Sequence, residues 1–319
     1  MKIKLVYTDS KIYNGIKSYS LNLYNDMSKV MDVKLKPLSI IQVSFKGKKF
    51  GGWITSEFFS LFVGNADIVH STAHWSLQPH TNVVTIHDLF PLTMKQYFNN
   101  PDYEINHQLK KLENVNKKAK YIIVQTSTIK NNVEKYIKNV PIAVIPSKIF
   151  VNQPTKNPYP DDKKLHLLTM GIIEPFPQRK QIYDLYEWIK DKDDVDLYHI
   201  GLVNDKRYID YSKNIHQIDS VSQQDKFNYM AYADKYVFKT LGEGQGYPVM
   251  EAMKLNTQTV INDLPEHREL LGDKPYYFHN KDEFLEMIYK SKKSGLVEQI
   301  SQYDNWIDKY KKVYEEVRK

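Results

Sequence analysis

The chain of 319 residues contains no cysteine. That absence excludes a disulfide scaffold, thiolate–zinc sites and thiol catalysis, and it fits a reducing compartment. No apolar run reaches the roughly 18 residues that a membrane-spanning helix needs. The first residues, MKIKLVYTD, have neither the apolar core nor the small-residue cleavage site of a signal peptide. We therefore expect no secretory leader and a cytoplasmic location.

Arginine is also absent from residues 1–150, which hold 20 lysines and 10 acidic residues, a net charge of about +10. The remaining residues carry a net charge of about −3. A basic first half favours an anionic partner, which is a membrane surface, a nucleic acid or an acidic substrate. Lysine-rich codon usage explains the same excess equally well. The first half matches no recognised nucleic-acid-binding module, so nucleic acid is the weaker alternative.

The G-x-G-x-x-G fingerprint of dinucleotide-binding proteins is missing, because the first strand is followed by DSKIYNGIKSY. This counts against a nicotinamide-dependent dehydrogenase. Hydrophobic residues make up 41% and charged residues 26%, which excludes disorder of the whole chain. At roughly 100–200 residues per domain, the length indicates two domains.

Short apolar runs alternate with amphipathic segments, a pattern typical of parallel sheets covered by helices on both faces. The expected strands are 2–8, 67–70, 82–86, 121–125, 142–145, 165–170, 197–200, 235–238 and 259–261. The expected helices are 15–27, 103–118, 128–137, 181–189, 226–232 and 248–255, followed by a largely helical tail from residue 282. Residues 147–164 contain three prolines among polar residues and form the best linker candidate.

The stretch Thr240–Met253, TLGEGQGYPVMEAM, is the most informative part of the sequence. Glu243 and Glu251 stand eight positions apart, and Pro248 marks the start of a helix. Such a strand-to-helix turn presents free backbone N–H groups that attract a phosphate, and its glycines let a ligand approach the backbone. A plain glycine-rich turn with two unrelated glutamates explains the same letters.

This stretch closely resembles the E-x7-E signature of retaining GT-B glycosyltransferases, specifically those of the family 4 group. Individually weaker matches follow the family's order over nearly the whole chain, at Tyr13–Leu23, Val83–Pro91, Ile122–Ile129, Leu168–Lys180 and Asn262–Gly272. The resemblance implies an α/β fold of GT-B architecture, with two Rossmann-like domains facing each other across a cleft. Residues 1–150 would bind the acceptor and residues 151–300 the nucleotide-sugar donor. Residues 301–319 would form a C-terminal helix, a candidate for packing back on the first domain.

The resemblance also implies a reaction. A hexose would pass from a UDP- or GDP-sugar, with retained anomeric configuration, to a lipid-linked sugar, a glycan or a protein. Glu251 would bind the ribose hydroxyls and Glu243 would lie beside the donor sugar. Arg179 and Lys180 would neutralise the charge that builds on the departing nucleoside diphosphate, and Lys180 is the better match to the family lysine. His87, at the end of a strand, would lie near the transferred sugar.

The resemblance assigns catalytic roles to Glu243, His87 and Lys180, and donor-binding roles to Gly15, Arg179, Lys180, Gly244, Gln245, Gly246, Tyr247 and Glu251. The plainer alternatives are a structural histidine, a solvated basic pair and an ordinary helix-initiating turn. No bound metal or other cofactor is expected, since GT-B enzymes generally rely on helix dipoles and basic side chains. His70, His74 and His80 lack metal-ligand spacing.

The sequence departs from the family pattern at two informative positions. Ile172 stands where the family usually has an arginine, and Gln245 stands where it usually has an aromatic residue. These changes leave a catalytically inactive GT-B scaffold as the nearest alternative.

The segment Phe45–Gly64 combines Lys46, Lys48 and Lys49 with several aromatic residues, which suits an anionic membrane surface. The apolar positions also fit one face of an internal helix. If the membrane interpretation holds, the enzyme is peripheral on the inner face and its acceptor is a lipid or a lipid-linked sugar.

Overall fold

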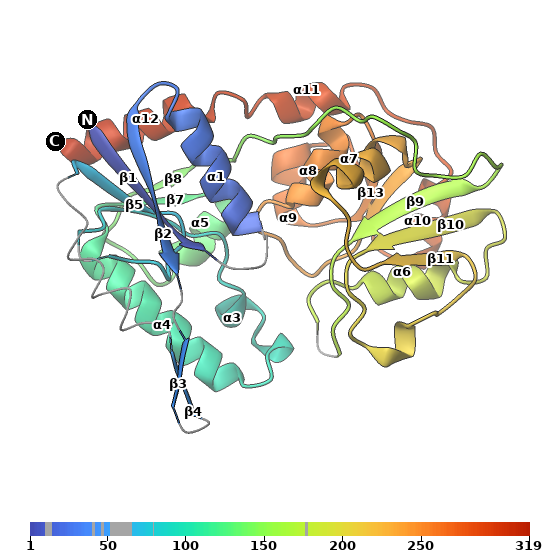
Figure 1. The fold of residues 1–319 in the computed structure, drawn as a ribbon, viewed down its shortest axis with the longest axis horizontal. Coiled ribbons are helices and arrows are strands. Elements are labelled where there is room, and N and C mark those ends of the chain that lie inside the picture. The colour runs from blue at the N-terminus through green and yellow to red at the C-terminus, as the bar shows by residue number, and fades with distance from the viewer. Residues whose placement is uncertain (10–14, 40–41, 46–47, 52–65, 79, 176–177) are drawn as a thin grey trace. The chain divides into compact units, whose positions relative to one another are not determined.

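The structure, a computed structural model, describes all residues except 10–14, 40–41, 46–47, 52–65, 79 and 176–177 (Figure 1). The chain divides into two compact units. Unit 1 comprises Met1–Lys95, Asn100–Ser147 and Asn305–Lys319, and unit 2 comprises Gln96–Asn99 and Lys148–Asp304. The boundary between the units thus follows Ser147, whereas the sequence analysis placed it after residue 150.

Unit 1 contains a six-stranded parallel sheet in the order β2-β1-β5-β6-β7-β8. Its strands are β1 (Lys2–Asp9), β2 (Asp32–Ser39), β5 (Ile68–Ser71), β6 (Val83–Thr85), β7 (Tyr121–Val124) and β8 (Ile142–Val144). The sequence analysis missed β2, an edge strand whose Lys34 and Lys36 are exposed and which contains Pro37. Lysine and proline are typical of edge strands and hide their apolar alternation. A separate antiparallel pair, β3 (Gln42–Phe45) and β4 (Lys48–Gly51), follows β2.

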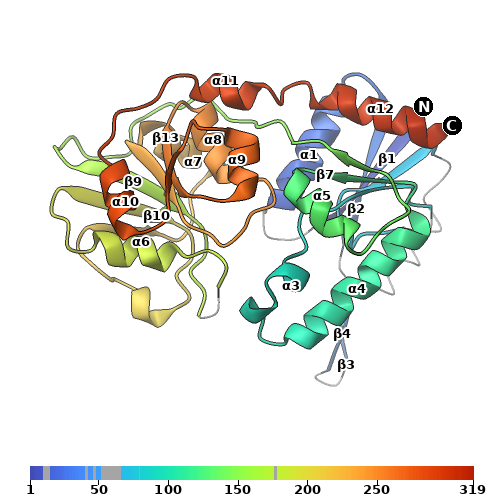
Figure 2. The same ribbon diagram turned by 180° about the vertical axis from the view of Figure 1, so that it is seen from behind.

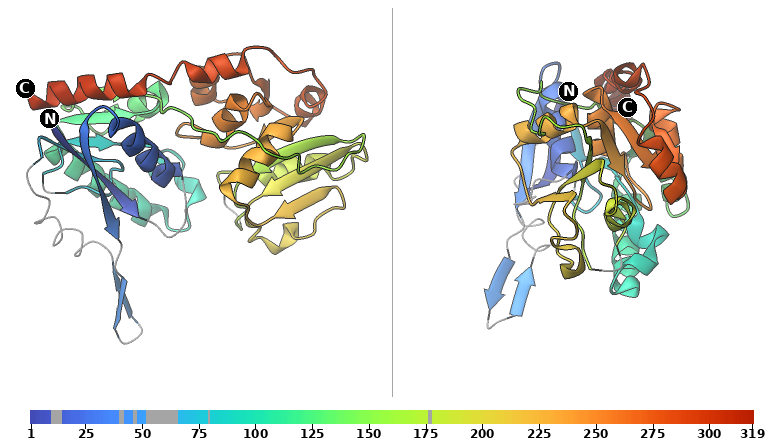
Figure 3. Two further views of the ribbon diagram at one scale, coloured as in Figure 1. Left: turned by 45° about the horizontal axis from the view of Figure 1, so that its top comes forward. Right: turned by 90° about the vertical axis from the view of Figure 1, so that its right-hand side faces the viewer.

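Helices cover both faces of the unit 1 sheet, because its central strands β5 and β6 are mostly apolar and buried at every position. Helices α4 (Pro101–Lys118) and α5 (Ser127–Glu134) pack on one face through an apolar cluster that includes Val84, Ile122 and Val124 (Figure 2). Helices α1 (Gly15–Met27) and α12 (Trp306–Arg318) contact strands of the same sheet and each other (Figure 3). The short elements α3 (Phe90–Thr93) and η1 (Lys95–Tyr97) precede α4.

The C-terminal helix is fastened to unit 1 by polar contacts as well as by apolar packing. Trp306 Nε1 donates to Asp26 Oδ2 at 3.1 Å, and the hydroxyls of Tyr310 and Tyr19 lie 2.6 Å apart. All four side chains are buried. Helix α12 therefore belongs to the fold of unit 1, although the whole of Lys148–Asp304 separates it in sequence from the rest of that unit.

Unit 2 contains a second six-stranded parallel sheet in the order β11-β10-β9-β12-β13-β14 (Figure 1). Its strands are β9 (Leu165–Met170), β10 (Val195–Ile200), β11 (Ile215–Ile218), β12 (Lys235–Phe238), β13 (Gln258–Asn262) and β14 (Tyr276–Phe278). The two edge strands, β11 and β14, were not expected from the sequence.

Successive residues of the unit 2 strands point to opposite faces. Tyr236 and Phe238 pack with α7 (Gln223–Tyr232), α8 (Tyr247–Lys254) and α11 (Leu296–Ser301), while Val237 packs with α6 (Ile182–Ile189) and α10 (Lys281–Met287). The remaining elements are η2 (Lys206–Tyr208) and α9 (Pro265–Leu271).

Candidate functional site

A topological switch point lies at the carboxyl edge of the unit 2 sheet. The chain runs outward from β9 to β10 and β11, then returns to β12 and runs outward on the other side to β13 and β14. In open parallel sheets, ligands bind at such a point, beyond the carboxyl ends of the strands. The loops that leave β9 and β12 are joined there by a bridge between Lys180 and Thr240, and by a 3.0 Å hydrogen bond from Leu241 N to the Arg179 carbonyl.

Arg179 and Glu243 form an ion pair between these two loops. Arg179 Nη1 lies 2.7 Å from Glu243 Oε1, and it also donates to the Gly242 carbonyl. Burial acts to raise the pKa of Glu243, but Arg179 and Lys180 together outweigh it and hold that pKa below its ordinary value. Glu243 is therefore an anion at neutral pH, and Arg179 is committed to it.

Lys180 is differently placed. Its side chain packs over Gly171, where an added Cβ would lie 2.9 Å from Lys180 Cδ, and its ammonium lies 5.5 Å from the ring centroid of Phe238. Loss of hydration, helped by Arg179, lowers the pKa of Lys180, while Glu243 opposes the change. Among the described residues we find no hydrogen bond or ion pair of its ammonium group. Lys180 is thus a cation available to an anionic ligand.

Helix α8 begins directly beyond the β12 loop. Its N-cap is Gly246, with φ 71° and ψ 50°, a left-handed conformation that glycine adopts without strain. Gly246 provides no side-chain cap, and Pro248 occupies the first turn of the helix. The positive end of the helix dipole at this N-terminus favours an anion.

Glu251 lies one turn into α8 and pairs with a lysine of the neighbouring helix. Lys226 Nζ on α7 donates to Glu251 Oε1 at 2.7 Å. Both side chains are largely buried, and burial raises the pKa of Glu251 against the opposing charge of Lys226. The sequence analysis expected Glu251 but missed Lys226, because the contact joins two helices 25 residues apart.

The residues between the two glutamates differ in exposure. Gln245 is buried, and its Nε2 contacts Met250 Sδ at 3.4 Å, so this substitution for the family's usual aromatic fills the interior. Gly244 and Tyr247 are half-buried. Ile172, where the family usually has an arginine, is 44% exposed.

Helix α9 contacts the loop between β12 and α8 and fixes its backbone. The sequence analysis did not identify this contact. Glu266 Oε1 accepts a 2.8 Å hydrogen bond from the backbone N–H of Glu243. His267 is fully buried, and a Cβ on Gly246 would lie 3.5 Å from its Nε2. The only sequence signal was the family match over Asn262–Gly272.

The two remaining candidates, His87 and Gly15, belong to unit 1. His87 Nε2 donates to the Thr72 carbonyl at 2.8 Å, and its ring meets Tyr19 edge to face with centroids 4.8 Å apart. Burial lowers the pKa of His87 to about 4, despite the bonds to Thr72 and Gln125 that favour its protonation. Gly15 begins α1, and a Cβ there would meet nothing within 4 Å. The structure thus groups Arg179, Lys180, Glu243–Tyr247 and Glu251 on unit 2, and places His87 and Gly15 on unit 1.

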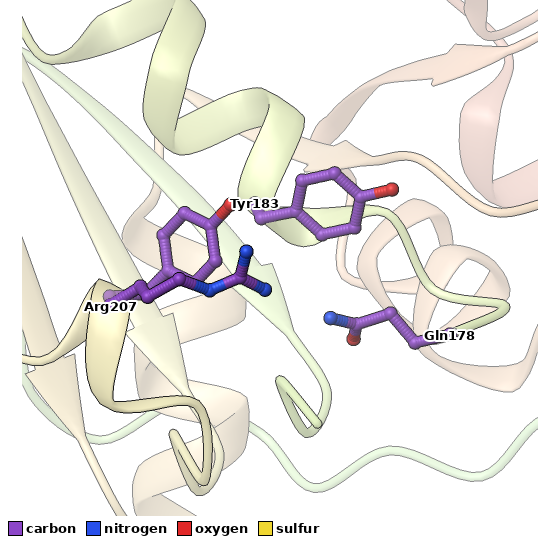
Figure 4. Close-up of a pocket in the computed structure, with 4 residues that line it drawn as sticks. Gln178, Tyr183 and Arg207 are labelled. Carbon is purple, nitrogen blue, oxygen red and sulfur yellow. The ribbon is translucent and has the colours of Figure 1, made fainter. Parts of the chain in front are cut away.

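A small pocket of about 150 Å³ lies beyond β9 and β10, lined by Gln178, Tyr183, Arg207 and Tyr208 (Figure 4). Gln178 is engaged with both backbone groups of Glu174. Arg207 forms a two-pronged ion pair with Asp205. Since these polar groups are already paired, we assign the pocket no role.

Most of the basic and aromatic segment 45–64 lies outside the described residues, which include only Phe45 at the end of β3 and the four residues of β4. Within the described part of the chain, helices long and apolar enough to cross a bilayer are absent.

Comparison with known proteins yields no matching family model. The O-antigen chain mannosyltransferase RfbU of Salmonella typhimurium is 23% identical over 303 residues, which span 91% of this chain and 79% of that protein. Sucrose-phosphate synthase from Thermosynechococcus elongatus has a TM-score of 0.76 at 12% identity, covering 99% of both chains. Anabaena HepE, solved with UDP and glucose, has a TM-score of 0.70 at 12% identity, covering 98% of both chains.

These similarities extend over both units, and each unit holds a parallel six-stranded sheet covered by helices. The expected fold class is confirmed: the chain has the two-sheet α/β architecture of GT-B glycosyltransferases.

Proposed function

We propose that the protein is a retaining glycosyltransferase that moves a hexose from a UDP- or GDP-sugar to an acceptor bound by unit 1. The observation that carries the proposal is the cluster at the unit 2 switch point. There Lys180, the anion Glu243, the N-terminus of α8 and Glu251 in the second turn of α8 lie near one sheet edge. Two similar proteins agree with it, because RfbU is a mannosyltransferase and HepE was solved with UDP and glucose.

Lys180 and the α8 N-terminus would hold the diphosphate. Arg179 and Lys180 would have different tasks, since Glu243 neutralises Arg179 and leaves the charge of Lys180 for the ligand. The lowered pKa of Lys180 reflects its lost hydration, and a diphosphate would replace the missing partner. The carboxylate of Glu243 and the backbone N–H groups of Gly244–Tyr247 would orient the donor sugar.

Glu251 would accept hydrogen bonds from the ribose hydroxyls. Lys226 holds one of its oxygens, Oε1, so that the carboxylate is fixed in one orientation. A carboxylate has about four lone-pair sites, which leaves acceptor capacity for a ribose. This role requires no proton transfer by Glu251.

The reaction would follow the front-face course described for retaining GT-B enzymes. The bond between the anomeric carbon and the diphosphate oxygen breaks, the acceptor hydroxyl oxygen bonds to the same face of that carbon, and its proton passes to the departing phosphate. Lys180 stabilises the charge that develops on the leaving group. Neutral His87 would position the transferred sugar, and no step calls for a metal ion.

The acceptor would be a lipid-linked sugar, a glycan or a protein. The lysine-rich first half favours an anionic surface, such as the inner face of a membrane, as the place of attachment. Binding to vesicles of neutral and of anionic lipid tests membrane attachment. Electrostatic attachment predicts stronger binding to the anionic vesicles and weaker binding as the salt concentration rises. Equal binding to both vesicle types would remove it without touching the transferase proposal.

The test is a transfer assay with UDP- and GDP-sugars, with and without EDTA, in which hydrolysis and transfer products are separated. The proposal expects one nucleotide class to support turnover, unaffected by EDTA, with an α-configured donor giving an α-linked product. Binding of a nucleotide without turnover on any acceptor would instead favour the inactive scaffold. Salt-sensitive binding of DNA or RNA, with no nucleotide-sugar binding, would favour a nucleic-acid-binding protein.

A further inference from the structure

A cluster of acidic and imidazole side chains lies at the opposite, amino edge of the unit 2 sheet. His166 and Asp196 are the second residues of the adjacent strands β9 and β10 (Figure 1), and the strand register pairs them directly. Asp162 lies in the segment that enters β9. One ligand atom from each of these three residues lies within 4.8 Å of the other two.

The nitrogen of His166 that faces this cluster makes no hydrogen bond. The side chain is 9% exposed, and its Nε2 lies 3.2 Å from Asp162 Oδ1 without the geometry of a hydrogen bond. An imidazole nitrogen without its proton and a carboxylate oxygen both carry lone pairs, so they repel at this distance. This unpartnered ring nitrogen, aimed at a carboxylate oxygen, is therefore available as a ligand atom for a metal ion.

A second imidazole repeats the arrangement. His216 Nε2 is buried without a hydrogen bond and lies 3.4 Å from Asp196 Oδ2. Both rings are held in place by stacking, His166 against Tyr159 with centroids 5.0 Å apart and His216 against Tyr198 at 4.5 Å. Two fixed imidazole nitrogens therefore face carboxylates at one edge of the sheet.

We propose that Asp162, His166 and Asp196 bind a divalent transition-metal ion, of which Zn²⁺ is the best match. Imidazole nitrogen and carboxylate oxygen are zinc ligands at about 2.0–2.2 Å, and ligands at that distance from a tetrahedral centre are about 3.3–3.6 Å apart. The 3.2 Å separation of His166 Nε2 and Asp162 Oδ1 is close to this range, and the Asp196 oxygen, within 4.8 Å of both, would move inward on binding. Three protein ligands leave one position for water, as in other three-ligand zinc sites.

Lys164 is the competing cation. Its Nζ lies 2.9 Å from Asp196 Oδ1, and its side chain is 39% exposed, so it can withdraw into solvent. Metal binding would join the segment before β9 to β9 and β10, because Asp162 stands outside the sheet. The ion would stabilise unit 2 at the edge away from the proposed donor site and would take no part in transfer.

The experiment uses the tag-free full-length chain after EDTA treatment and dialysis. Zn²⁺ is titrated by calorimetry, Co²⁺ by its visible absorption, and unfolding is followed with and without each ion. The proposal expects one ion per chain and a higher midpoint of thermal unfolding. The absence of binding at millimolar Zn²⁺ would overturn it.

His166→Phe tests the ligand while keeping a ring against Tyr159. It should raise the dissociation constant more than about 100-fold, beyond the 10- to 100-fold typical of outer-shell residues. His80→Gln, a change at an exposed histidine of unit 1, should leave it unchanged. Unchanged affinity in His166→Phe would assign the metal to another site and contradict the proposal.

Lys164→Met separates a metal site from an ion-pair network. If the cluster binds metal, removal of the competing ammonium should tighten Zn²⁺ binding. Lower stability together with unchanged or weaker Zn²⁺ binding would identify the cluster as an ion-pair network and overturn the proposal.

Discussion

The two sheets share one kind of topology but differ in the chemistry near their carboxyl edges. In unit 2, Arg179, Lys180 and Glu243 meet there, and Lys226 pairs with Glu251 close by. In unit 1, the corresponding region holds buried imidazoles. Desolvation lowers the pKa of His70 to about 3, of His74 to about 3 and of His87 to about 4. Unit 2 thus carries charged side chains near its carboxyl edge, whereas the buried imidazoles of unit 1 are neutral at pH 7.

Burial keeps the unit 1 imidazoles neutral, and hydrogen bonds fix the orientation of their rings. His70 Nδ1 lies 2.7 Å from the Tyr314 hydroxyl, and its Nε2 lies 2.8 Å from Thr85 Oγ1. Tyr19 joins the same network through Thr85 at 2.8 Å and contacts the His87 ring. The C-terminal helix, through Tyr314, therefore shapes the surroundings of the candidate histidine. Two parallel sheets of the same kind can thus differ in chemistry: charged side chains gather near the unit 2 sheet, and a neutral hydrogen-bonded network lies near the unit 1 sheet.

Removing the uncommitted cation of unit 2 should have the largest effect. We expect Lys180→Ala to slow transfer by roughly 10²–10³-fold, the usual loss for one group that stabilises a transition-state anion. Lys206→Ala, a change at an exposed lysine of the same unit, is the matched control. Turnover is measured at saturating donor, and a rate near that of the unaltered protein would remove Lys180 from the reaction.

Acid should destabilise unit 1 more than unit 2. His70, His74 and His87 have pKa values in the fold far below the ordinary 6.5, so below that pH the unfolded chain binds protons that the fold rejects. Stability is therefore retained above about pH 6.5 and falls toward pH 4, by about 2 kcal/mol per histidine at pH 5.

Unit 2 contains fewer such groups with a large shift, chiefly His199, whose pKa burial lowers to about 4. Peptide-resolved hydrogen exchange at pH 7 and pH 5, corrected for intrinsic rates, measures the difference. Loss of protection in unit 2 before unit 1 would contradict the comparison.

Glu251→Ala should weaken nucleotide binding by roughly 10- to 100-fold, because hydrogen bonds to a charged group contribute about 1.5–3 kcal/mol. Calorimetry with UDP and GDP gives the affinity, and Glu298→Ala, at an exposed glutamate of α11, is the control. Unfolding is measured in parallel, since the change leaves Lys226 without this partner. Unaltered nucleotide affinity in a folded variant would rule out the ribose role.

The smallest expected effect is that of Tyr310→Phe, which removes the hydroxyl 2.6 Å from Tyr19 OH. A net loss of about 1 kcal/mol in the free energy of unfolding is typical of one buried hydrogen bond. Tyr289→Phe, at a 51% exposed tyrosine of unit 2, should cost less. Equal losses in denaturant titrations would indicate that the unit 1 network contributes no more than a surface contact.

Most of the fold could be predicted from the sequence because local alternation determines it. Strand β12 and helix α1 have the predicted bounds: β12 is a short, mostly apolar run that is buried at every position, and α1 places Tyr19, Leu23 and Met27 on its buried face. Strands β2 and β11 were missed because edge strands bury less and carry polar side chains. Their existence depends on pairing with distant segments, which periodicity does not encode.

The candidate site was predictable only where it is local. The Glu243–Glu251 spacing is contained in one loop and one helix, so it can be read from adjacent letters. The Arg179–Glu243 pair joins residues 64 positions apart, and Lys226 reaches Glu251 from another helix. The pairing of His166 with Asp196 arises from strand register alone, which explains why the sequence offered no metal-ligand spacing.

The central claim is that unit 2 binds a nucleoside diphosphate at its carboxyl edge without a metal ion. The most direct measurement is peptide-resolved hydrogen exchange with UDP, GDP or ADP and their sugars, each with and without EDTA. The account predicts that one nucleotide protects the peptides containing Lys180 and Gly244–Glu251, equally in EDTA, and that Lys180→Ala reduces this protection. Protection that requires a divalent metal, or no protection of these peptides by any nucleotide, would contradict it.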